Sequence, residues 1–185
     1  VETLAGQRID IVAEKGAVTI DKAKVTKTDI EATNGVIHVI DTVILPSDKT
    51  VVQTAAEASN FKTLAMLLEK ADLIGALSGE GPFTVFAPTD DAFAKLPKET
   101  VESLLKPENK AQLQEILKFH VVSGRVFSDA ALKAGKAKTL QGGEIAIKSE
   151  KGKATVNGAN LTATDLDASN GVIHVIDTVI LPSKK

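Results

Sequence analysis

Three histidines are the residues of this chain best suited to acid–base chemistry or to metal binding. His38 and His174 lie in identical sequence surroundings, and His120 lies in a different one. No two of them have the close spacing of a His-x-x-x-His ligand pair, and no cysteine is present to complete a zinc site. A histidine inside an Ile-His-Val strand is usually a hydrogen-bonded core residue. We therefore predict no metal site. A hydrolase that uses His120 with a carboxylate is kept as a weaker hypothesis about function, behind the two main ones given below.

Asp90 and Asp91 are adjacent carboxylates, which could suggest a catalytic acid–base pair. Adjacent positions on a helix do not face each other, however. Thr89 predicts a helix cap at this point, and carboxylates in a first turn interact favourably with the helix dipole. The chain has no Gly-x-Ser-x-Gly elbow and no Gly-rich loop followed by Lys and Ser or Thr. These features predict a structural role for both aspartates, and a protein that is not an enzyme and has no cofactor.

Composition limits the classes of partner. The 185 residues contain 22 Lys and Arg against 24 Asp and Glu, a net charge of −2 without a basic stripe, which argues against nucleic acid. No apolar run approaches the ~18 residues of a membrane span. Tyr and Trp are both absent, which weakens the case for a carbohydrate-binding platform.

The elements that would position these residues change type along the chain. Between residues 49 and 136 the apolar residues follow a helical period, and Ser59 or Asn60 is the expected cap of a helix that starts near Phe61. The middle segment also contains a short apolar run that predicts a buried strand, Phe83–Ala87. Further helices are predicted near residues 73–77, 89–96, 97–105 and 113–120. Ser128 is expected to cap a last short helix that runs through Leu132, with Gly135 as its end. Helices in the middle and strands at the end form an α+β pattern.

The segments on either side of this middle part are two copies of one sequence. The letters NGVIHVIDTVILPS occur at Asn34–Ser47 and again 136 residues later at Asn170–Ser183, and the match extends upstream without a gap. Asn157-Gly158 predicts a hairpin turn, and Val172, His174 and Ile176 are expected on one face of a buried strand. A period of this length suits a whole small domain. We expect residues 1–48 to be the C-terminal third of a preceding domain, and residues 49–185 to be a complete one.

Three segments, in this order, resemble the fasciclin family. Thr84–Phe93 resembles the first signature segment of fasciclin-like domains, and Asn170–Asp177 with Leu181-Pro182 resembles the second. Between them, Glu115–Val122 resembles the tyrosine–histidine segment of the family, with Phe119 in place of the tyrosine. The resemblance implies an α+β fold, a β-wedge of two sheets with a helical layer on one side. It also implies secreted or surface-attached adhesion modules, often in tandem.

The resemblance places a candidate binding site in the tyrosine–histidine segment, because such segments in animal relatives are linked to receptor attachment. Core packing is the alternative for the two aliphatic residues, which lie on the apolar face of the expected helix, and the missing tyrosine hydroxyl removes a polar contact. The candidate binding residues are Glu115, Ile116, Leu117, Phe119 and His120.

The first copy of the repeat, residues 1–47, contains many apolar side chains that need to be buried. Residues 36 to 45 carry seven aliphatic side chains, and leaving most of them in water forfeits ~1.5–3 kcal/mol each, or ~10 kcal/mol together. Micromolar association requires only ~8 kcal/mol. The core of one domain can accommodate only one copy of these strands. We therefore predict that the other copy pairs with a second chain, which gives a homo-oligomer or swapped dimer through residues 1–47. A disordered or proteolysed remnant is the alternative.

Two main hypotheses about function follow. The first is an extracellular, secreted cell-adhesion or protein-interaction module without catalytic activity, with a protein partner at the cell surface or matrix. The second is a carrier that holds a small hydrophobic ligand in a cleft between sheet and helices. A pigment or lipid extracted from the purified protein would favour the carrier.

Overall fold

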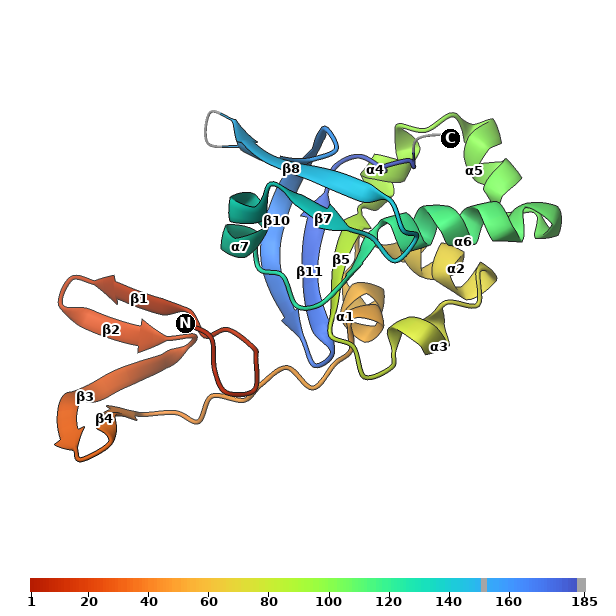
Figure 1. Cartoon of the computed structure of the whole chain (residues 1–185). Helices are drawn as coiled ribbons and strands as arrows, with labels where there is room; N and C mark the ends of the chain where they lie inside the picture. The colour runs from red at the N-terminus through yellow and green to blue at the C-terminus, as the bar shows by residue number, and fades with distance from the viewer. Residues whose placement is uncertain (151–152, 183–185) are drawn as a thin grey trace. The chain divides into compact units, whose positions relative to one another are not determined.

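The computed structural model describes residues 1–150 and 153–182 and divides the chain into two compact units, Val1–Ser47 and Asp48–Lys185 (Figure 1). Each unit has a sheet of its own, and all the described helices belong to the second unit. We describe the two units separately.

The first unit is an antiparallel sheet with the strand order β1-β2-β3-β4. Lys15 and Gly16 connect the first two strands at φ angles of 50° and 79°, as the two central positions of a type I′ hairpin turn require. Among the hydrophobic residues of this unit, only Ala23 is buried. The strands are β1 (Ile11–Glu14), β2 (Ala17–Ile20), β3 (Ala23–Ala32) and β4 (Gly35–Ile40).

The second unit contains a seven-stranded sheet with the order β6-β5-β11-β10-β9-β8-β7. The β5–β11 pair is parallel and the other pairs are antiparallel. A bridge between Val122 and Thr139 joins the two ends of this order, so the sheet is nearly closed. The strands are β5 (Phe83–Pro88), β6 (Val121–Ser123), β7 (Lys136–Lys138), β8 (Glu144–Glu150), β9 (Lys153–Val156), β10 (Ala159–Ala168) and β11 (Gly171–Ile176). The predicted hairpin turn joins β9 to β10, with Asn157 and Gly158 at φ 46° and 87°.

Seven α-helices accompany the sheet in the described part of the second unit (Figure 1). They are α1 (Val51–Glu57), α2 (Lys62–Lys70), α3 (Ile74–Leu77), α4 (Asp90–Ala94), α5 (Lys98–Leu104), α6 (Lys110–Phe119) and α7 (Ser128–Ala134). A 3-10 turn at Pro107–Asn109 leads into α6. Helices and a mixed sheet in one unit confirm the predicted α+β class.

Two of the predicted helix caps are wrong. Neither Ser59 nor Asn60 caps α2 with its side chain. Instead, the carboxylate of Asp90 accepts from the backbone N–H groups of Lys62 and Thr63, at 3.3 and 2.7 Å. Ser128 is inside α7, and the carboxylate of Asp165 accepts from its backbone N–H at 2.7 Å. Both acceptors come from distant parts of the chain, so local sequence patterns do not reveal them.

The core forms two clusters of buried side chains, consistent with the predicted alternation along β11. Ile173 and Val175 pack in the cluster to which α1–α6 contribute. Ile176 packs in the other cluster with Phe86 and residues of β8, β9 and α7. Six helices therefore cover one face of the central strands, and α7 packs in the cluster of the opposite face.

Candidate functional site

His120 follows α6, and its ring makes two hydrogen bonds inside the core. Its Nδ1 lies 2.8 Å from the carbonyl oxygen of Ile116, and its Nε2 lies 3.2 Å from the backbone nitrogen of Ile180. A carbonyl only accepts, so Nδ1 carries the proton and Nε2 accepts from the Ile180 N–H. Burial lowers the pKa of His120 to about 4, and the ring is neutral at pH 7. Both ring nitrogens are used within the fold, so a proton-transfer or metal-binding role would first have to break a buried hydrogen bond.

His174 lies at the centre of β11 and is 1% exposed. Its Nε2 lies 2.9 Å from the carbonyl oxygen of Val126, and its Nδ1 accepts from the backbone N–H of Asp165 at 3.3 Å. Burial lowers the pKa of His174 below its ordinary value. Across residues 1–150 and 153–182, no group of three or more His, Asp or Glu side chains is placed to hold a metal ion.

The adjacent carboxylates have different roles in the fold. Thr89 caps α4, with its hydroxyl accepting from the backbone N–H of Ala92 at 3.2 Å, as predicted. Burial raises the pKa of Asp90, but its hydrogen bonds from the N-terminus of α2 outweigh burial and leave that pKa lowered. Asp91 is exposed in the first turn of α4. Asp90 therefore connects two helices, and the pair does not form a shared acid–base site.

The structure places the five candidate binding residues at the end of α6 and separates them by burial. Glu115 is exposed, whereas the other four side chains are between 3% and 8% exposed. Ile116 and Leu117 belong to the helical core cluster, and Phe119 belongs to the opposite one. A partner that docks on the surface of this segment therefore meets Glu115, one turn before the exposed Lys118.

An apolar pocket of about 180 Å³ adjoins this exposed end of α6. Its lining includes Lys118 of α6 and Ala76 of α3, and both residues are exposed. Leu140, one of its apolar lining residues, is 43% exposed. The other lining residues include Leu73, Leu77, Phe83, Leu117 and Val121. We take this pocket, with Glu115 and Lys118, as the candidate functional site and name it the α3–α6 pocket.

The side chains of Arg125 and Asn170 make long-range contacts that the sequence patterns did not predict. The guanidinium of Arg125 pairs with Asp167 at 2.9 Å and donates to three backbone carbonyls of residues 168–171. The buried side chain of Asn170 accepts from the backbone N–H of Val51 at 2.9 Å. Asn170 begins the second fasciclin-like segment, but the long-range contacts of its side chain carry no local signal.

A sequence comparison matches the fasciclin domain over residues 1–46 and 59–182. Protein sll1483 of Synechocystis sp. is 47% identical over 167 residues, covering 90% of this chain and 89% of that protein. Human periostin is 32% identical over 185 residues, covering 98% of this chain but 22% of periostin. The pig transforming growth factor-beta-induced protein ig-h3 is 33% identical over 169 residues, covering 90% of this chain and 24% of that protein. The chain thus spans less than a quarter of these two mammalian relatives.

A comparison of structures gives the same fold. The FAS1 domain pair of the insect cell adhesion molecule fasciclin I matches with a TM-score of 0.68 and 20% sequence identity. The match covers 94% of this chain and 67% of the insect chain. At this level of identity the likeness establishes the fold.

Proposed function

Because the chain belongs to the fasciclin domain family, we propose that it is a non-catalytic adhesion or protein-interaction module that acts through its surface. The α3–α6 pocket carries this proposal, since its lining combines apolar side chains with Lys118, and Glu115 is exposed on the same helix three residues before Lys118. Interfaces commonly place an apolar anchor in such a pocket and surround it with polar residues. The description of fasciclin I as a cell adhesion molecule supports the proposal.

A pair of variants on α3 tests the site. Ala76 is exposed and lines the pocket, so Ala76→Arg fills the opening without entering the core. Gly75→Arg is the matched control, because Gly75 does not line the pocket and a Cβ added there meets no atom within 4 Å. The chain is immobilised, a partner is captured from a cell-surface extract and identified, and its affinity is then measured with purified protein. We expect A76R to bind at least ~10-fold more weakly and G75R to bind normally; equal affinities would remove the pocket from the interface.

The exposed candidate residue has a test of its own. Glu115→Lys reverses an exposed charge on α6 without touching the core, and Glu108→Lys makes the same change on the turn before α6. Rim charges act mainly on association rate and salt dependence. We expect E115K alone to change the association rate of the identified partner. The predicted contribution of Ile116, Leu117, Phe119 and His120 to binding stays a prediction, and their burial indicates an indirect contribution through the position of α6.

The carrier hypothesis is a second candidate, and the same pocket is the observation that favours it. Its volume of about 180 Å³ is below the ~300–1,000 Å³ of ordinary small-molecule sites. A cavity of this size holds one large apolar side chain of a partner more readily than a pigment. Solvent extraction of the purified protein, followed by absorbance and mass spectrometry, tests the carrier, and a stoichiometric apolar compound would favour it over adhesion.

The proposal includes an extracellular or secreted location, with a protein partner at the cell surface or matrix. No described helix is long and apolar enough to cross a membrane. Separation of culture medium, envelope and cell contents, followed by antibody detection of the chain, tests this location. Recovery from the cell contents alone would contradict it.

Association between copies through residues 1–47 also stays a prediction. Five aliphatic side chains of the segment 36–45 are exposed by 40% or more, namely Val36, Ile37, Val39, Val43 and Leu45. Light scattering of the full chain beside a version that begins at residue 48 measures whether this surface joins two copies. If both versions are monomeric, the prediction is wrong.

A further inference from the structure

The α3–α6 pocket has walls that belong to the core of the second unit. Its lining residues Leu73, Leu77 and Leu117 are between 4% and 8% exposed, and all three are members of the helical core cluster. Walls held by the core are in place before any partner binds. Binding in a preformed pocket requires little ordering of side chains, so more of the contact energy contributes to affinity.

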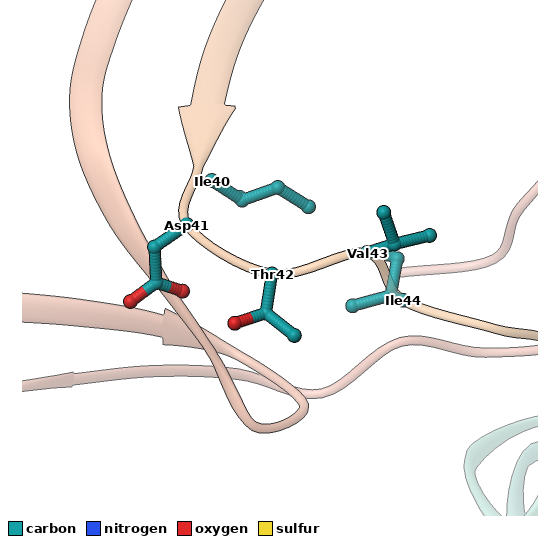
Figure 2. A pocket seen from close by; sticks show the side chains of 5 residues that line it. All are labelled: Ile40, Asp41, Thr42, Val43 and Ile44. Atoms are coloured by element: carbon teal, nitrogen blue, oxygen red, sulfur yellow. The ribbon is translucent and has the colours of Figure 1, made fainter.

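A second hollow, in the first unit, is larger but differently built. Figure 2 shows its lining, residues 40–44, and its volume is about 270 Å³. A single short segment supplies all of these residues, and Val43 among them is 80% exposed. The α3–α6 pocket is lined by residues of several elements and is the more enclosed of the two. It is therefore the better site for a ligand.

Backbone polar groups in the wall of the α3–α6 pocket are already bonded within the fold. The N–H of Leu77 donates to the carbonyl of Leu73 at 3.0 Å, and the carbonyl of Leu77 accepts from the side chain of Asn170 at 2.9 Å. The N–H of Leu140 donates to the carbonyl of Val121 at 2.7 Å. These N–H groups are not available to a ligand, so apolar contacts have to provide most of the attraction inside the hollow.

Lys118 is the exception in this apolar lining. Of the described residues that line the pocket, it alone carries a charge. It is exposed, and its ammonium has no hydrogen-bond or ion-pair partner within residues 1–150 and 153–182. Its place in the last turn of α6 is one where a cation interacts favourably with the helix dipole, which leaves the ammonium able to bind an anion.

This unpaired charge discriminates between occupants of the pocket. A wholly apolar partner that covers Lys118 removes water from the ammonium and gives nothing in return, which is unfavourable. A partner with an anion at this point replaces the lost water by a charge-assisted hydrogen bond. The lining therefore favours an apolar group that has a negative charge beside it.

The anion that fits best is a carboxylate. Phosphate recognition commonly uses clusters of arginine, and no described residue of the lining is an arginine. A single lysine is a compact point charge, which suffices for a carboxylate. The hollow, at about 180 Å³, is smaller than ordinary small-molecule sites of ~300–1,000 Å³. One large side chain of a partner, rather than a whole ligand, matches this volume.

We propose that the α3–α6 pocket binds a partner segment in which a large apolar side chain lies next to a carboxylate in sequence. The apolar side chain enters the hollow, and the carboxylate pairs with the ammonium of Lys118. This inference rests on the proposed function and specifies the kind of partner segment that the module binds. It separates binding into an apolar contribution and an ionic one, which can be removed independently.

Short peptides with blocked ends test the two contributions. The peptide Gly-Asp-Leu-Asp-Gly has a carboxylate on each side of its leucine, so the order of the two groups does not affect the outcome. Gly-Asn-Leu-Asn-Gly keeps the shape and removes the charges, and Gly-Asp-Ala-Asp-Gly keeps the charges and removes the apolar side chain. Each peptide is titrated to about 10 mM, which detects millimolar affinity, into the isotopically labelled full chain. The readout is the chemical shift of the backbone amides.

We expect the Asp-Leu-Asp peptide to shift the amides of Ala76, Leu77 and Leu140 and to leave those of the first unit unchanged. The Asn form should bind ~3–5-fold more weakly, because an exposed ion pair contributes modestly to affinity. The Ala form should bind at least ~10-fold more weakly, because burial of the leucine side chain is lost. Equal affinities of the Asp and Asn forms, or no shift of the pocket amides with any peptide, would overturn the proposal.

Charge reversal at Lys118 tests the ionic contact directly. With Lys118→Glu, Gly-Lys-Leu-Lys-Gly should bind more tightly than the Asp-Leu-Asp peptide. Lys98→Glu is the matched control, because Lys98 is an exposed lysine of α5 outside the pocket lining, and it should keep the wild-type order of affinities. If Lys118 serves only the helix dipole, K118E will lower the stability and keep the wild-type preference, which would contradict the proposal.

Two further titrations test other occupants of the pocket. Octanoate is a free carboxylic acid with an apolar chain, and tighter binding of octanoate than of the Asp-Leu-Asp peptide would assign the pocket to a small-molecule carrier. Shifts of the pocket amides that grow with the concentration of the full chain alone would assign it to a second copy. Either result would overturn the proposal.

The captured partner of the adhesion experiment separates this inference from the proposed function. We expect both A76R and K118E to weaken its binding, and K98E to leave it unchanged. If A76R weakens binding and K118E does not, the partner uses the pocket without a carboxylate at Lys118, and this inference alone is wrong. If A76R and G75R bind the partner equally, the pocket is not the adhesion site.

Discussion

The two buried histidines carry their ring protons on opposite nitrogens. His120 donates from Nδ1 to a carbonyl, whereas His174 places Nε2 against one. Each ring therefore joins two parts of the chain, as a neutral imidazole with one donor and one acceptor can do. This use of both nitrogens explains why burial of these rings is tolerated, and it favours a structural role over acid–base catalysis.

His120 should make the folded state sensitive to mild acid. Its pKa falls from 6.5 to about 4 on folding, so the unfolded chain binds more protons between these pH values. The contribution of neutral His120 to the free energy of unfolding is therefore fully present above pH 6.5 and is lost as the pH falls towards 4. The shift corresponds to ~3 kcal/mol. Urea unfolding at pH 7 and pH 4.5 measures this loss.

Two leucine variants isolate the contribution of His120. His120→Leu should be ~2 kcal/mol less stable at pH 7, because the Ile180 N–H loses its acceptor, and should lose less stability than the wild type on acidification. His38→Leu makes the same change at the exposed copy of the strand histidine and should follow the wild type. A wild-type acid response in H120L would show that other groups cause it.

Asp90 should contribute more to stability than the neighbouring Asp91. Asp90→Ala leaves two N-terminal N–H groups of α2 without their acceptor and should cost ~1–2 kcal/mol. Asp91→Ala is the matched control on the same turn, and it should cost under ~0.5 kcal/mol because Asp91 is exposed and acts through the dipole alone. Chemical denaturation of both variants checks the difference, and equal losses would contradict the cap.

At the scale of elements, Arg125 connects the segment before α7 to the turn between β10 and β11. Its side chain is 11% exposed and that of its partner Asp167 is 16% exposed. Arg125→Ala removes the guanidinium that pairs with the largely buried carboxylate of Asp167 and donates to three backbone carbonyls, so we expect a loss of ~3–5 kcal/mol. Lys136→Ala is the control, because the Lys136–Glu144 pair is 66% and 60% exposed and is worth under ~1 kcal/mol. Denaturation curves measure both losses.

The elements that sequence patterns predict well are those whose signal is local. The Asn157-Gly158 turn needs positive φ, and the helix predicted to start near Phe61 needs one apolar face, so both can be predicted from a few neighbouring residues. The caps from Asp90 and Asp165 come from segments distant in sequence, and so do the contacts of Arg125. Their identity depends on the completed fold.

The same limit applies to the candidate site. The apolar periodicity predicted a helix near residues 113–120, where α6 ends, but the fold directs four of the five candidate side chains of this segment inward. The lining of the α3–α6 pocket comes from several separate elements, including Leu140 just after β7. Nothing in the spacing of these residues indicates that they meet.

At the scale of the whole molecule, each unit contains one copy of the repeat, and the two units differ greatly in how many apolar side chains they bury. Residues 137–182 share the buried clusters of the second unit, to which helices and strands both contribute. The repeat in residues 1–47 keeps its strands and turns but has one buried hydrophobic residue, Ala23. Since burial of apolar area is the main source of stability, identical strands should differ greatly in stability here.

We therefore expect the first unit of the isolated chain to open far more easily than the second. Amides of β4 should exchange at least ~100-fold faster than those of β11, because opening β4 breaks hairpin hydrogen bonds alone, whereas opening β11 disrupts the core. Hydrogen exchange at low protein concentration measures both strands in one sample. A version that begins at residue 48 should keep the β11 rates, since the second unit has its own core. Equal protection of both strands in the dilute chain would contradict this expectation.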